Sequence, residues 1–405
     1  MSTQTKNIGL IGFGTVGHGF YNYLVENNED KQLATVVIKN PSKSRIPDTL
    51  NFSTAINDVH NNKEITTVVE LISDYEQAFP IVKQALLQGK NVVSSNKKMI
   101  AYHLEELVKL EQNSKGTFLY EGSVAGSIPI IKIINEHYAY DEITEIRGIL
   151  NGTSNYILTQ IFEKGMNYSE ALNQAQEAGF AEANPTSDVE GYDALYKLLI
   201  LATHAFGKFI LPEKALVIGI NNIKTSDISF AKNNHLTIKL VGSLKTVGNK
   251  LTLSVLPTFV DEKDDLFFVK NEYNAVEVIS KNIGSQFYKG KGAGSLPTGH
   301  VVYTDYKLIE SAKYSYKNIP SGKRLKYETN QNIWVYSDRI TLLEKYLNEV
   351  VLLKGPEGYG SIKISDLIKA KELINIHNIS IIALNDTIRE KISTRLNKKR
   401  QLMHA

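Results

Sequence analysis

The sequence predicts an α/β protein in three parts: a doubly wound parallel sheet, an α+β domain with an open mixed sheet, and a small α+β C-terminal domain. Over roughly the first 130 residues, short β-branched runs alternate with amphipathic helical patterns, which is typical of a parallel sheet covered on both faces. After Pro129 longer strands appear, with a hairpin signal at Val247-Gly248-Asn249. A separate unit of roughly 80 residues begins near Gly322.

The expected elements follow from these patterns. In the first part we expect strands at 7–11, 33–38, 66–72, 91–95 and 117–122, with helices through Tyr21 and Leu24 and at 76–88 and 101–113. In the second part we expect strands at 143–150, 216–223, 236–247 and 250–260 and helices at 153–164, 168–178 and 192–206. The C-terminal part is expected to contain strand 332–337, helix 339–349, a glycine-rich turn at 355–360, helix 365–375 and strand 379–384.

Composition excludes several classes of protein. The 405 residues include no cysteine, which removes disulfides, thiolate zinc sites and catalytic thiols and suits a reducing cytoplasm. The net charge of +3 gives no indication of nucleic-acid binding. No apolar run approaches the roughly 20 residues of a membrane span, and the N-terminus lacks a signal-peptide pattern. We therefore expect a cytoplasmic protein that acts on a small molecule, without nucleic-acid or membrane partners.

A glycine-rich motif follows the first expected strand. Gly12-Phe13-Gly14-Thr15-Val16-Gly17 lies between that strand and a helical pattern. In this context Gly12 permits a tight turn, Gly14 lets a pyrophosphate approach the backbone, and Gly17 lets helix and strand pack closely. The motif predicts a Rossmann-type dinucleotide-binding domain. The alternative is a glycine-rich turn in a domain that binds no nucleotide.

The end of the second expected strand indicates which dinucleotide binds. NAD-preferring sites place a carboxylate there for the ribose 2′-hydroxyl, whereas this chain has no acid between Lys31 and Pro47. Lys39, Lys43 and Arg45 instead provide positive charge for a 2′-phosphate. We therefore expect NADP(H) as the preferred cofactor. NAD(H) is the alternative if these residues form an ordinary basic surface loop.

Charged residues gather just before a strongly apolar helix. Glu182 and Asp188 precede the expected helix 192–206, on which Asp193 and Lys197 are four residues apart and share a face. Asn151 offers a neutral hydrogen-bonding group in the same stretch of chain. Charges at the edge of a core are costly unless they are paired or bind a polar ligand. The cluster therefore predicts a polar substrate site, and the alternative for Asp193 and Lys197 is an exposed ion pair.

A second candidate lies in the nucleotide-binding part. The segment Ser94-Ser95-Asn96-Lys97-Lys98 comes at the end of strand 91–95, and open α/β sheets bind ligands at the carboxyl ends of their strands. We therefore expect Lys97 to reach the substrate, so that the site depends on both parts of the chain. The alternative is a solvated lysine, as we expect for Lys98.

These segments together resemble the homoserine dehydrogenase family. The resemblance covers residues 1 to about 315 and rests on GFGTVG at 12–17, SSNKK at 94–98, YEGSVAGSIP at 120–129, GILNGTSNYIL at 148–158, AEANPTSDVEGYDALYK at 181–197 and GKGAGSLPT at 290–298. It implies a nucleotide-binding domain at 1–130 completed by 288–318 and a substrate-binding and dimerisation domain at 131–287. Residues 322–405 would form an ACT-like or appended domain.

The resemblance also implies an activity and a set of residue roles. The family interconverts L-aspartate 4-semialdehyde and L-homoserine with a nicotinamide cofactor, on the route to threonine, methionine and isoleucine. Lys97, Lys197 and Asp193 are then catalytic. Substrate contacts are implied for Glu182, Asp188, Asp193, Gly152, Thr153 and Lys97. Beyond the glycine motif and the three basic residues after the second strand, cofactor contacts are implied for Ser73, Ser94, Asn96, Lys97, Gly292 and Ala293. A monovalent cation, Na⁺ or K⁺, would be held mostly by backbone oxygens of Glu121, Val124, Gly126 and Ile128.

The chain departs from the family pattern at several positions. Asn184 stands where Asp is usual, and Ser337-Asp338-Arg339-Ile340 replaces an acid-x-proline-glycine ligand loop, which argues against threonine feedback. An acylating semialdehyde dehydrogenase is excluded because it needs a thiol. The remaining alternative is a non-catalytic nicotinamide-nucleotide-sensing protein on the same fold. We expect a homodimer with its interface on the sheet of 143–150 and 236–260.

Overall fold

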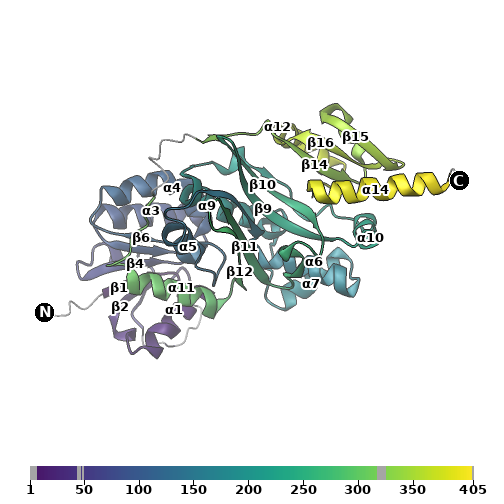
Figure 1. Cartoon of the computed structure of the whole chain (residues 1–405). Coiled ribbons are helices and arrows are strands. Elements are labelled where there is room, and N and C mark those ends of the chain that lie inside the picture. Colours follow the sequence, from purple (N-terminus) through teal and green to yellow (C-terminus); the bar gives the residue numbers. More distant parts are fainter. Residues whose placement is uncertain (1–6, 43–46, 48–49, 317–324, 404–405) are drawn as a thin grey trace. The chain divides into compact units, whose positions relative to one another are not determined.

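The computed structural model describes residues 7–42, 47, 50–316 and 325–403 (Figure 1). The chain forms two compact units. The first comprises Met1–Tyr140, Leu199–Pro212 and Gly290–Ser321, and the second comprises Asp141–Leu198, Glu213–Lys289 and Gly322–Ala405. Residues 322–405 therefore belong to the same compact unit as most of the expected substrate domain. The division into three domains stays a prediction.

The first unit is built on a six-stranded parallel sheet. The strand order is β3-β2-β1-β4-β5-β6, and each neighbouring pair is parallel. The chain order reverses between β1 and β4, as in doubly wound sheets that bind dinucleotides. The predicted fold class is confirmed for this unit. Its strands are β1 (Asn7–Ile11), β2 (Leu33–Val37), β3 (Phe52–Ser53), β4 (Ile65–Glu70), β5 (Asn91–Ser94) and β6 (Phe118–Leu119).

Helices cover both faces of this sheet. In Figure 1, α1 (Thr15–Glu26) and α11 (Ser295–Leu308) lie on one side, and α3 (Tyr75–Leu87) and α4 (Lys97–Gln112) lie on the other. The contact between α1 and α11 requires glycine, because a Cβ at Gly19 would lie 2.0 Å from the Ser295 carbonyl oxygen. The short helices α2 (Asn57–His60) and α5 (Ile130–Glu136) complete the unit.

A buried aromatic cluster contains a neutral histidine in the first unit. His204 is 2% exposed. Its Nδ1 accepts from Asn135 Nδ2 at 2.9 Å, and its Nε2 lies 2.9 Å from the Tyr120 hydroxyl, which in turn is 3.0 Å from the Tyr316 hydroxyl. Burial lowers the pKa of His204 to about 3. The ring is therefore uncharged at neutral pH.

The second unit contains one large mixed sheet. Its order is β12-β11-β7-β9-β10-β17-β14-β16-β15, and β8 and β13 also pair with β10. The predicted hairpin is confirmed, since β9 and β10 pair antiparallel along their whole length and Gly248 adopts a φ of +61° at the turn. The strands are β7 (Ile143–Ile149), β8 (Leu216–Val217), β9 (Thr237–Val247), β10 (Lys250–Val260), β11 (Tyr273–Ser280), β12 (Gly284–Lys291), β13 (Lys326–Tyr327), β14 (Asn332–Ser337), β15 (Leu347–Lys354), β16 (Glu357–Lys363) and β17 (Ile382–Leu384).

The helices of the second unit include those that the sequence predicted next to the charged cluster. The expected helices 153–164, 168–178 and 192–206 are α6 (Gly152–Lys164), α7 (Tyr168–Glu177) and α9 (Tyr192–Phe206), and the division between the two units falls within α9. The remaining helices are α8 (Thr186–Val189), α10 (Thr225–Asn233), α12 (Ile364–Lys369), α13 (Lys371–Ile376) and α14 (Asp386–Met403).

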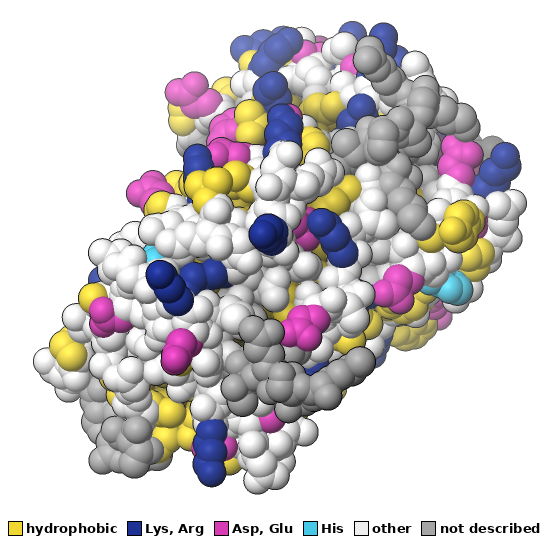
Figure 2. All heavy atoms as spheres, turned by 90° about the vertical axis from the view of Figure 1, so that its left-hand side faces the viewer, with side chains coloured by type: hydrophobic (Ala, Val, Ile, Leu, Met, Phe, Trp, Pro, Cys, Tyr) yellow, Lys and Arg dark blue, Asp and Glu magenta, His cyan; other side chains and the backbone are white. Residues whose placement is uncertain are grey.

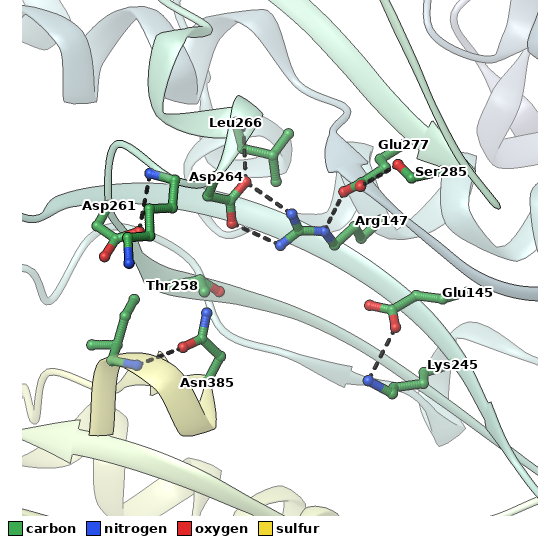
Figure 3. Close-up of polar contacts among 12 residues, drawn as sticks. Glu145, Arg147, Lys245, Thr258, Asp261, Asp264, Leu266, Glu277, Ser285 and Asn385 are labelled. Atoms are coloured by element: carbon green, nitrogen blue, oxygen red, sulfur yellow. Dashed lines mark hydrogen bonds and ion pairs between the residues drawn. The ribbon is translucent and has the colours of Figure 1, made fainter. Parts of the chain in front are cut away.

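An arginine on β7 joins three segments of the mixed sheet (Figure 3). Arg147 donates to both carboxylate oxygens of Asp264 at 2.8 Å and, through Nε, to Glu277 at 2.6 Å. Ser285 donates to the other oxygen of Glu277 at 2.6 Å. These bonds hold the turn after β10 over the small apolar cluster of Ile149, Val241, Leu266, Val269 and Ala275.

Three local predictions for this unit were wrong. The expected helix 339–349 is a short 3-10 helix, Ile340–Tyr346, followed by strand β15, and the expected turn at 355–360 includes the start of β16. The β-branched pair Val350-Val351 favours a strand once β16 is available as an antiparallel partner. The expected strand 216–223 contains only β8, because Ile220 N donates to Val189 O at 2.8 Å and the chain turns at 221–222.

Charged side chains are spread over the surface that Figure 2 displays. Lys and Arg are interspersed there with Asp and Glu and with apolar side chains. Within the part of the chain that the structure describes, no helix has the length and apolar character needed to cross a membrane.

Candidate active site

The glycine motif adopts the geometry that the sequence predicted. Gly12 has a φ of +100°, and a Cβ there would lie 2.8 Å from the Leu71 carbonyl; a Cβ at Gly17 would lie 2.5 Å from the Gly12 oxygen. Gly14 is the N-cap of α1, and a Cβ there would meet nothing within 4 Å. The first helical turn therefore opens onto free space, with its amides unblocked by a side-chain cap. Phe13 is buried, whereas Thr15 is exposed and Val16 is half-buried.

This loop fits a dinucleotide. The unfilled space at Gly14 and the uncapped helix N-terminus provide the cradle that a pyrophosphate needs. Lys39 is exposed just after β2, where a ribose 2′-substituent would be recognised. Lys43 and Arg45 lie outside the described residues. A parallel sheet with this loop at its switch point defines a dinucleotide-binding α/β protein.

A hydrogen-bonded network joins the carboxyl ends of β4 and β5. Ser94 Oγ donates to Glu70 at 2.6 Å, and Ile72 N donates to the other carboxylate oxygen at 2.8 Å. Asn96 caps α4 by accepting from Met99 N at 3.0 Å, and its Nδ2 donates to Ile72 O at 3.0 Å. Ser94 and Asn96 were predicted cofactor residues. Glu70 was missed, although an acid inside the apolar run TTVVELI at 66–72 was a signal.

Lys97 and Ser73 take their positions from this network. The helix expected at 101–113 begins earlier, so that Lys97 is the first residue of α4, directly after its Asn96 cap, and is half-buried. Ser73 is exposed in the loop before α3, whose N-cap Asp74 accepts from two backbone amides. Lys98 lies with its Nζ 3.8 Å from the centre of the Tyr75 ring. The structure thus places the predicted residues Ser73, Ser94, Asn96 and Lys97 at one edge of the sheet.

The predicted cluster in the second unit forms a continuous polar network. Asn151 caps α6, and its Nδ2 donates to Asp188 at 2.7 Å and to Asp193 at 2.8 Å. Lys197 Nζ lies 2.8 Å from the same Asp193 oxygen and donates to Leu150 O at 2.6 Å. The side chains of Lys197 and Asp193 are 8% and 5% exposed. The exposed ion pair is therefore excluded, because this pair is buried and hydrogen-bonded.

One partner of this network was not foreseen. Asn274 is fully buried on β11, and its Nδ2 donates to Leu150 O at 2.9 Å, so that the carbonyl is shared with Lys197. Residue 274 was not singled out in the sequence, because no strand was predicted there. Its position beside Leu150 results from the pairing of β11 with β7.

Other predicted substrate residues lie at the margin of this network. Thr153 Oγ1 donates to Phe180 O at 2.6 Å, and a Cβ at Gly152 would lie 2.6 Å from Glu272 O. Glu182 is exposed, and its backbone carbonyl accepts from Gln176 Nε2 at 3.1 Å. The structure therefore brings Asp188, Asp193 and Lys197 together but leaves Glu182 outside their hydrogen-bonded group.

The residues predicted to hold a cation form one loop of the first unit. Gly126 has a φ of +59°, and a Cβ there would lie 2.6 Å from Gly292 O, so that the predicted residues of both segments are in contact. The Glu121 carboxylate accepts from Ile131 N at 2.8 Å and Lys132 N at 2.9 Å. Burial and the nearby Asp305 raise the pKa of Glu121 to about 8. Val124 and Ile128 are buried, and Ala293 is exposed.

The site contains no cluster suited to a divalent metal. Within the described residues, no group of three or more His, Cys, Asp or Glu side chains could hold a metal ion. The Glu121 carboxylate is already used to cap α5. A cation at this loop would therefore depend on backbone oxygens, which suits a monovalent ion.

Comparison with known proteins assigns the family. Residues 12–121 match the model for the NAD binding domain of homoserine dehydrogenase, and residues 129–306 match the homoserine dehydrogenase model. The homoserine dehydrogenase of Bacillus subtilis is 38% identical over 313 residues, which are 75% of this chain and 72% of that protein. The chain belongs to the homoserine dehydrogenase family, and it is an oxidoreductase with a nicotinamide-binding domain.

Solved structures agree with this assignment. A homoserine dehydrogenase from Thiobacillus denitrificans superposes with a TM-score of 0.80 at 28% identity, covering 94% of this chain and 98% of that chain. A hyperthermophilic archaeal homoserine dehydrogenase in complex with NADPH has a TM-score of 0.66 at 25% identity, covering 76% of this chain and 99% of that chain. Because the first structure covers 94% of this chain, the structural similarity includes C-terminal residues as well.

Proposed function

We propose that this enzyme transfers a hydride reversibly between NADP(H) and the pair L-aspartate 4-semialdehyde and L-homoserine. The proposal depends chiefly on the network of Asn151, Asp188, Asp193 and Lys197, which lies within the residues 129–306 that match the homoserine dehydrogenase model. The bound nicotinamide supplies or accepts the hydride. Asp193 and the Leu150 carbonyl hold the Lys197 ammonium in place. In this position the ammonium stabilises the negative charge that develops on the carbonyl oxygen of the substrate and donates a proton to it.

Lysine substitutions test these roles. Lys197→Met and Lys97→Met should each lower kcat by about 100-fold or more while cofactor binding persists. Lys98→Met is the matched control, because Lys98 adjoins Lys97 but packs on Tyr75. Steady-state homoserine oxidation gives kcat, and nucleotide fluorescence gives binding. Near-normal kcat in both Lys97→Met and Lys197→Met would contradict the assignment.

The acidic residues account for a substrate with a free amino group. The α-ammonium of homoserine needs a carboxylate, and Asp188 is half-buried beside Asn151. Glu182, at the exposed end of the same segment, is the second candidate, and Gly152 and Thr153 supply amide and hydroxyl contacts. Asp188→Asn should raise KM for homoserine more than KM for the nucleotide. Equal effects on both values would argue against this role.

We propose NADP(H) as the preferred cofactor, with NAD(H) as the alternative. The support is the exposed Lys39 and the absence of an acid after β2 in the sequence. The ratio of KM values for NADP and NAD tests the preference, and Lys39→Asp should move it toward NAD. A clear preference of the wild type for NAD(H) would overturn the assignment.

A monovalent cation, Na⁺ or K⁺, is proposed at the loop of Glu121, Val124, Gly126 and Ile128. The left-handed backbone at Ala125 and Gly126 turns this segment sharply, which favours several carbonyls converging on one point. Replacing K⁺ and Na⁺ by choline should lower the thermal midpoint as well as the rate. An unchanged midpoint and rate in choline would rule out the site.

We further propose a homodimer whose interface includes the sheet of β7, β9 and β10. The support is that Glu145 and Arg147 lie half-buried on this sheet, and that Lys245, which is exposed, pairs with Glu145 at 3.0 Å (Figure 3). Light scattering should give twice the chain mass of 45.3 kDa. A mass of one chain at micromolar concentration would refute the dimer.

NADPH oxidation followed by absorbance, with and without aspartate semialdehyde, tests the proposed substrate. The same assay with threonine tests regulation. We expect no threonine inhibition, because Asp338 of the altered loop is paired with Lys224 at 2.5 Å and accepts from Ser380 at 3.1 Å.

A further inference from the structure

Glu70 is a buried carboxylate at the ligand-binding edge of the parallel sheet. It is the last residue of β4, aligned with Ile11 of β1 on one side and with Ser94 of β5 on the other. It is 0% exposed. This position is next to the switch point of the sheet, where doubly wound proteins bind their ligands.

The contacts of Glu70 fix the loops on either side. Its carboxylate accepts from Ile72 N, which fixes the start of the segment that contains Ser73, and from Ser94 Oγ. Asn96 links both loops, since its Nδ2 donates to Ile72 O while its Oδ1 caps the helix that begins at Lys97. The same segment also contacts the glycine loop. Leu71 N donates to Ile11 O at 2.8 Å, and the Leu71 carbonyl packs against Gly12.

The network requires an acceptor at both carboxylate oxygens. Ser94 Oγ accepts from Asn96 N at 3.1 Å, so its own proton is directed to Glu70. Ile72 N is also a donor. A glutamine of the same shape keeps an acceptor for Ile72 N in only one orientation, in which its NH₂ group faces Ser94 Oγ and the Ser94 proton loses its acceptor. Burial raises the pKa of Glu70 to about 7, although bonds from Ser94, Ile72 and Asn96 favour the ionised form. A buried carboxylate with a pKa shifted in this way is typical of functional sites.

We propose that Glu70 is a positioning residue of the nicotinamide-binding site, which holds the Ile72–Ser73 segment and the start of α4 in the geometry that the cofactor requires. This inference rests on the proposed function, because it assumes that a nicotinamide nucleotide binds at this edge. It assigns no contact between Glu70 and substrate or cofactor.

The test compares two isosteric substitutions of buried glutamates. Glu111 is the matched control: it is also 0% exposed and accepts from a backbone amide, Phe118 N at 3.0 Å, but it lies at the other end of α4. Glu70→Gln should raise the Kd of NADPH about tenfold or more, measured by NADPH fluorescence, and should raise the nucleotide KM more than it lowers kcat. Glu111→Gln should leave the Kd of NADPH within about twofold of the wild type, whatever its effect on the thermal midpoint.

Two outcomes would overturn the proposal: a Kd in Glu70→Gln equal to that of the wild type, or an equal rise in Glu111→Gln. If Glu70→Gln does not fold, Glu70→Asp keeps both acceptors on a shorter side chain, and its Kd should rise by a smaller factor. A wild-type Kd there would count against the proposal equally. Because binding is read directly, a wild type that binds NADPH but does not oxidise homoserine would contradict the proposed function and leave this test valid.

Discussion

A pair of alanine substitutions in the glycine motif separates binding from folding. Gly14→Ala adds a methyl group where nothing lies within 4 Å, on a backbone with φ of −93° and ψ of −155° that other residues can adopt. Gly17→Ala adds the same group 2.5 Å from the Gly12 carbonyl oxygen. The two changes are chemically identical and three residues apart, so that their difference reports the local structure.

The expected magnitudes follow from these contacts. Gly14→Ala should change the free energy of unfolding by no more than about 0.5 kcal/mol, because no atom has to move. It should still displace the pyrophosphate and weaken a charge-assisted hydrogen bond, which is worth about 1.5 kcal/mol or more, so the Kd of NADPH should rise about tenfold. For Gly17→Ala, overpacking against a backbone oxygen costs about 3 kcal/mol and helix propensity returns about 1 kcal/mol, which leaves a net loss of about 2 kcal/mol. The thermal midpoint should therefore fall by roughly 4–8 °C.

Calorimetry and NADPH fluorescence measure the two quantities on the same samples. The reasoning fails if Gly14→Ala binds NADPH with the wild-type Kd, since the open space would then not be the phosphate site. It also fails if Gly17→Ala is as stable as the wild type.

The other expected outcomes concern buried charge. Asp193→Asn keeps an oxygen that can accept from Asn151 but removes the charge beside Lys197, so kcat should fall about 100-fold with the fold intact, and a kcat within threefold would disprove the pairing role. The pKa of His204 is about 3 in the folded state and 6.5 in the unfolded state. As pH falls below 6.5 only the unfolded state gains the proton, so the free energy of unfolding decreases. Between pH 7 and pH 5 the free energy of unfolding of the wild type should fall by about 2 kcal/mol relative to that of His204→Gln. Urea unfolding midpoints that change equally with pH in both proteins would contradict this. Arg147→Ala leaves two acids unpaired and should lower the free energy of unfolding by about 3 kcal/mol, unlike Lys245→Ala on the neighbouring strand.

The active-site network illustrates how far sequence patterns reach. The spacing of Asp193 and Lys197 predicted a shared helix face, and the structure confirms both the helix and the ion pair. The partners that make this pair a buried network come from distant segments: Asn151 and Leu150 precede α6, and Asn274 lies on β11. Helical spacing cannot specify these contacts, because they depend on how β7 and β11 pair.

The sequence by itself determined the elements whose signals are local. The glycine motif and the alternation of strands and helices are encoded within short windows of residues, and the predicted parallel sheet is confirmed on that basis. Strand β15 was not predicted, and the expected helix 339–349 overlaps its first residues, because antiparallel pairing with β16 decides the conformation there.

Only the tertiary structure decided which charged groups are buried together. Glu70 meets Ser94 because β4 and β5 pair in parallel with those residues aligned. Glu182 was expected with the other acids, yet it is exposed while Asp193 is 3% exposed. The physical reason is that burial and hydrogen-bond partners depend on strand register and on the packing of distant segments, whereas periodicity reports only the face of a single element.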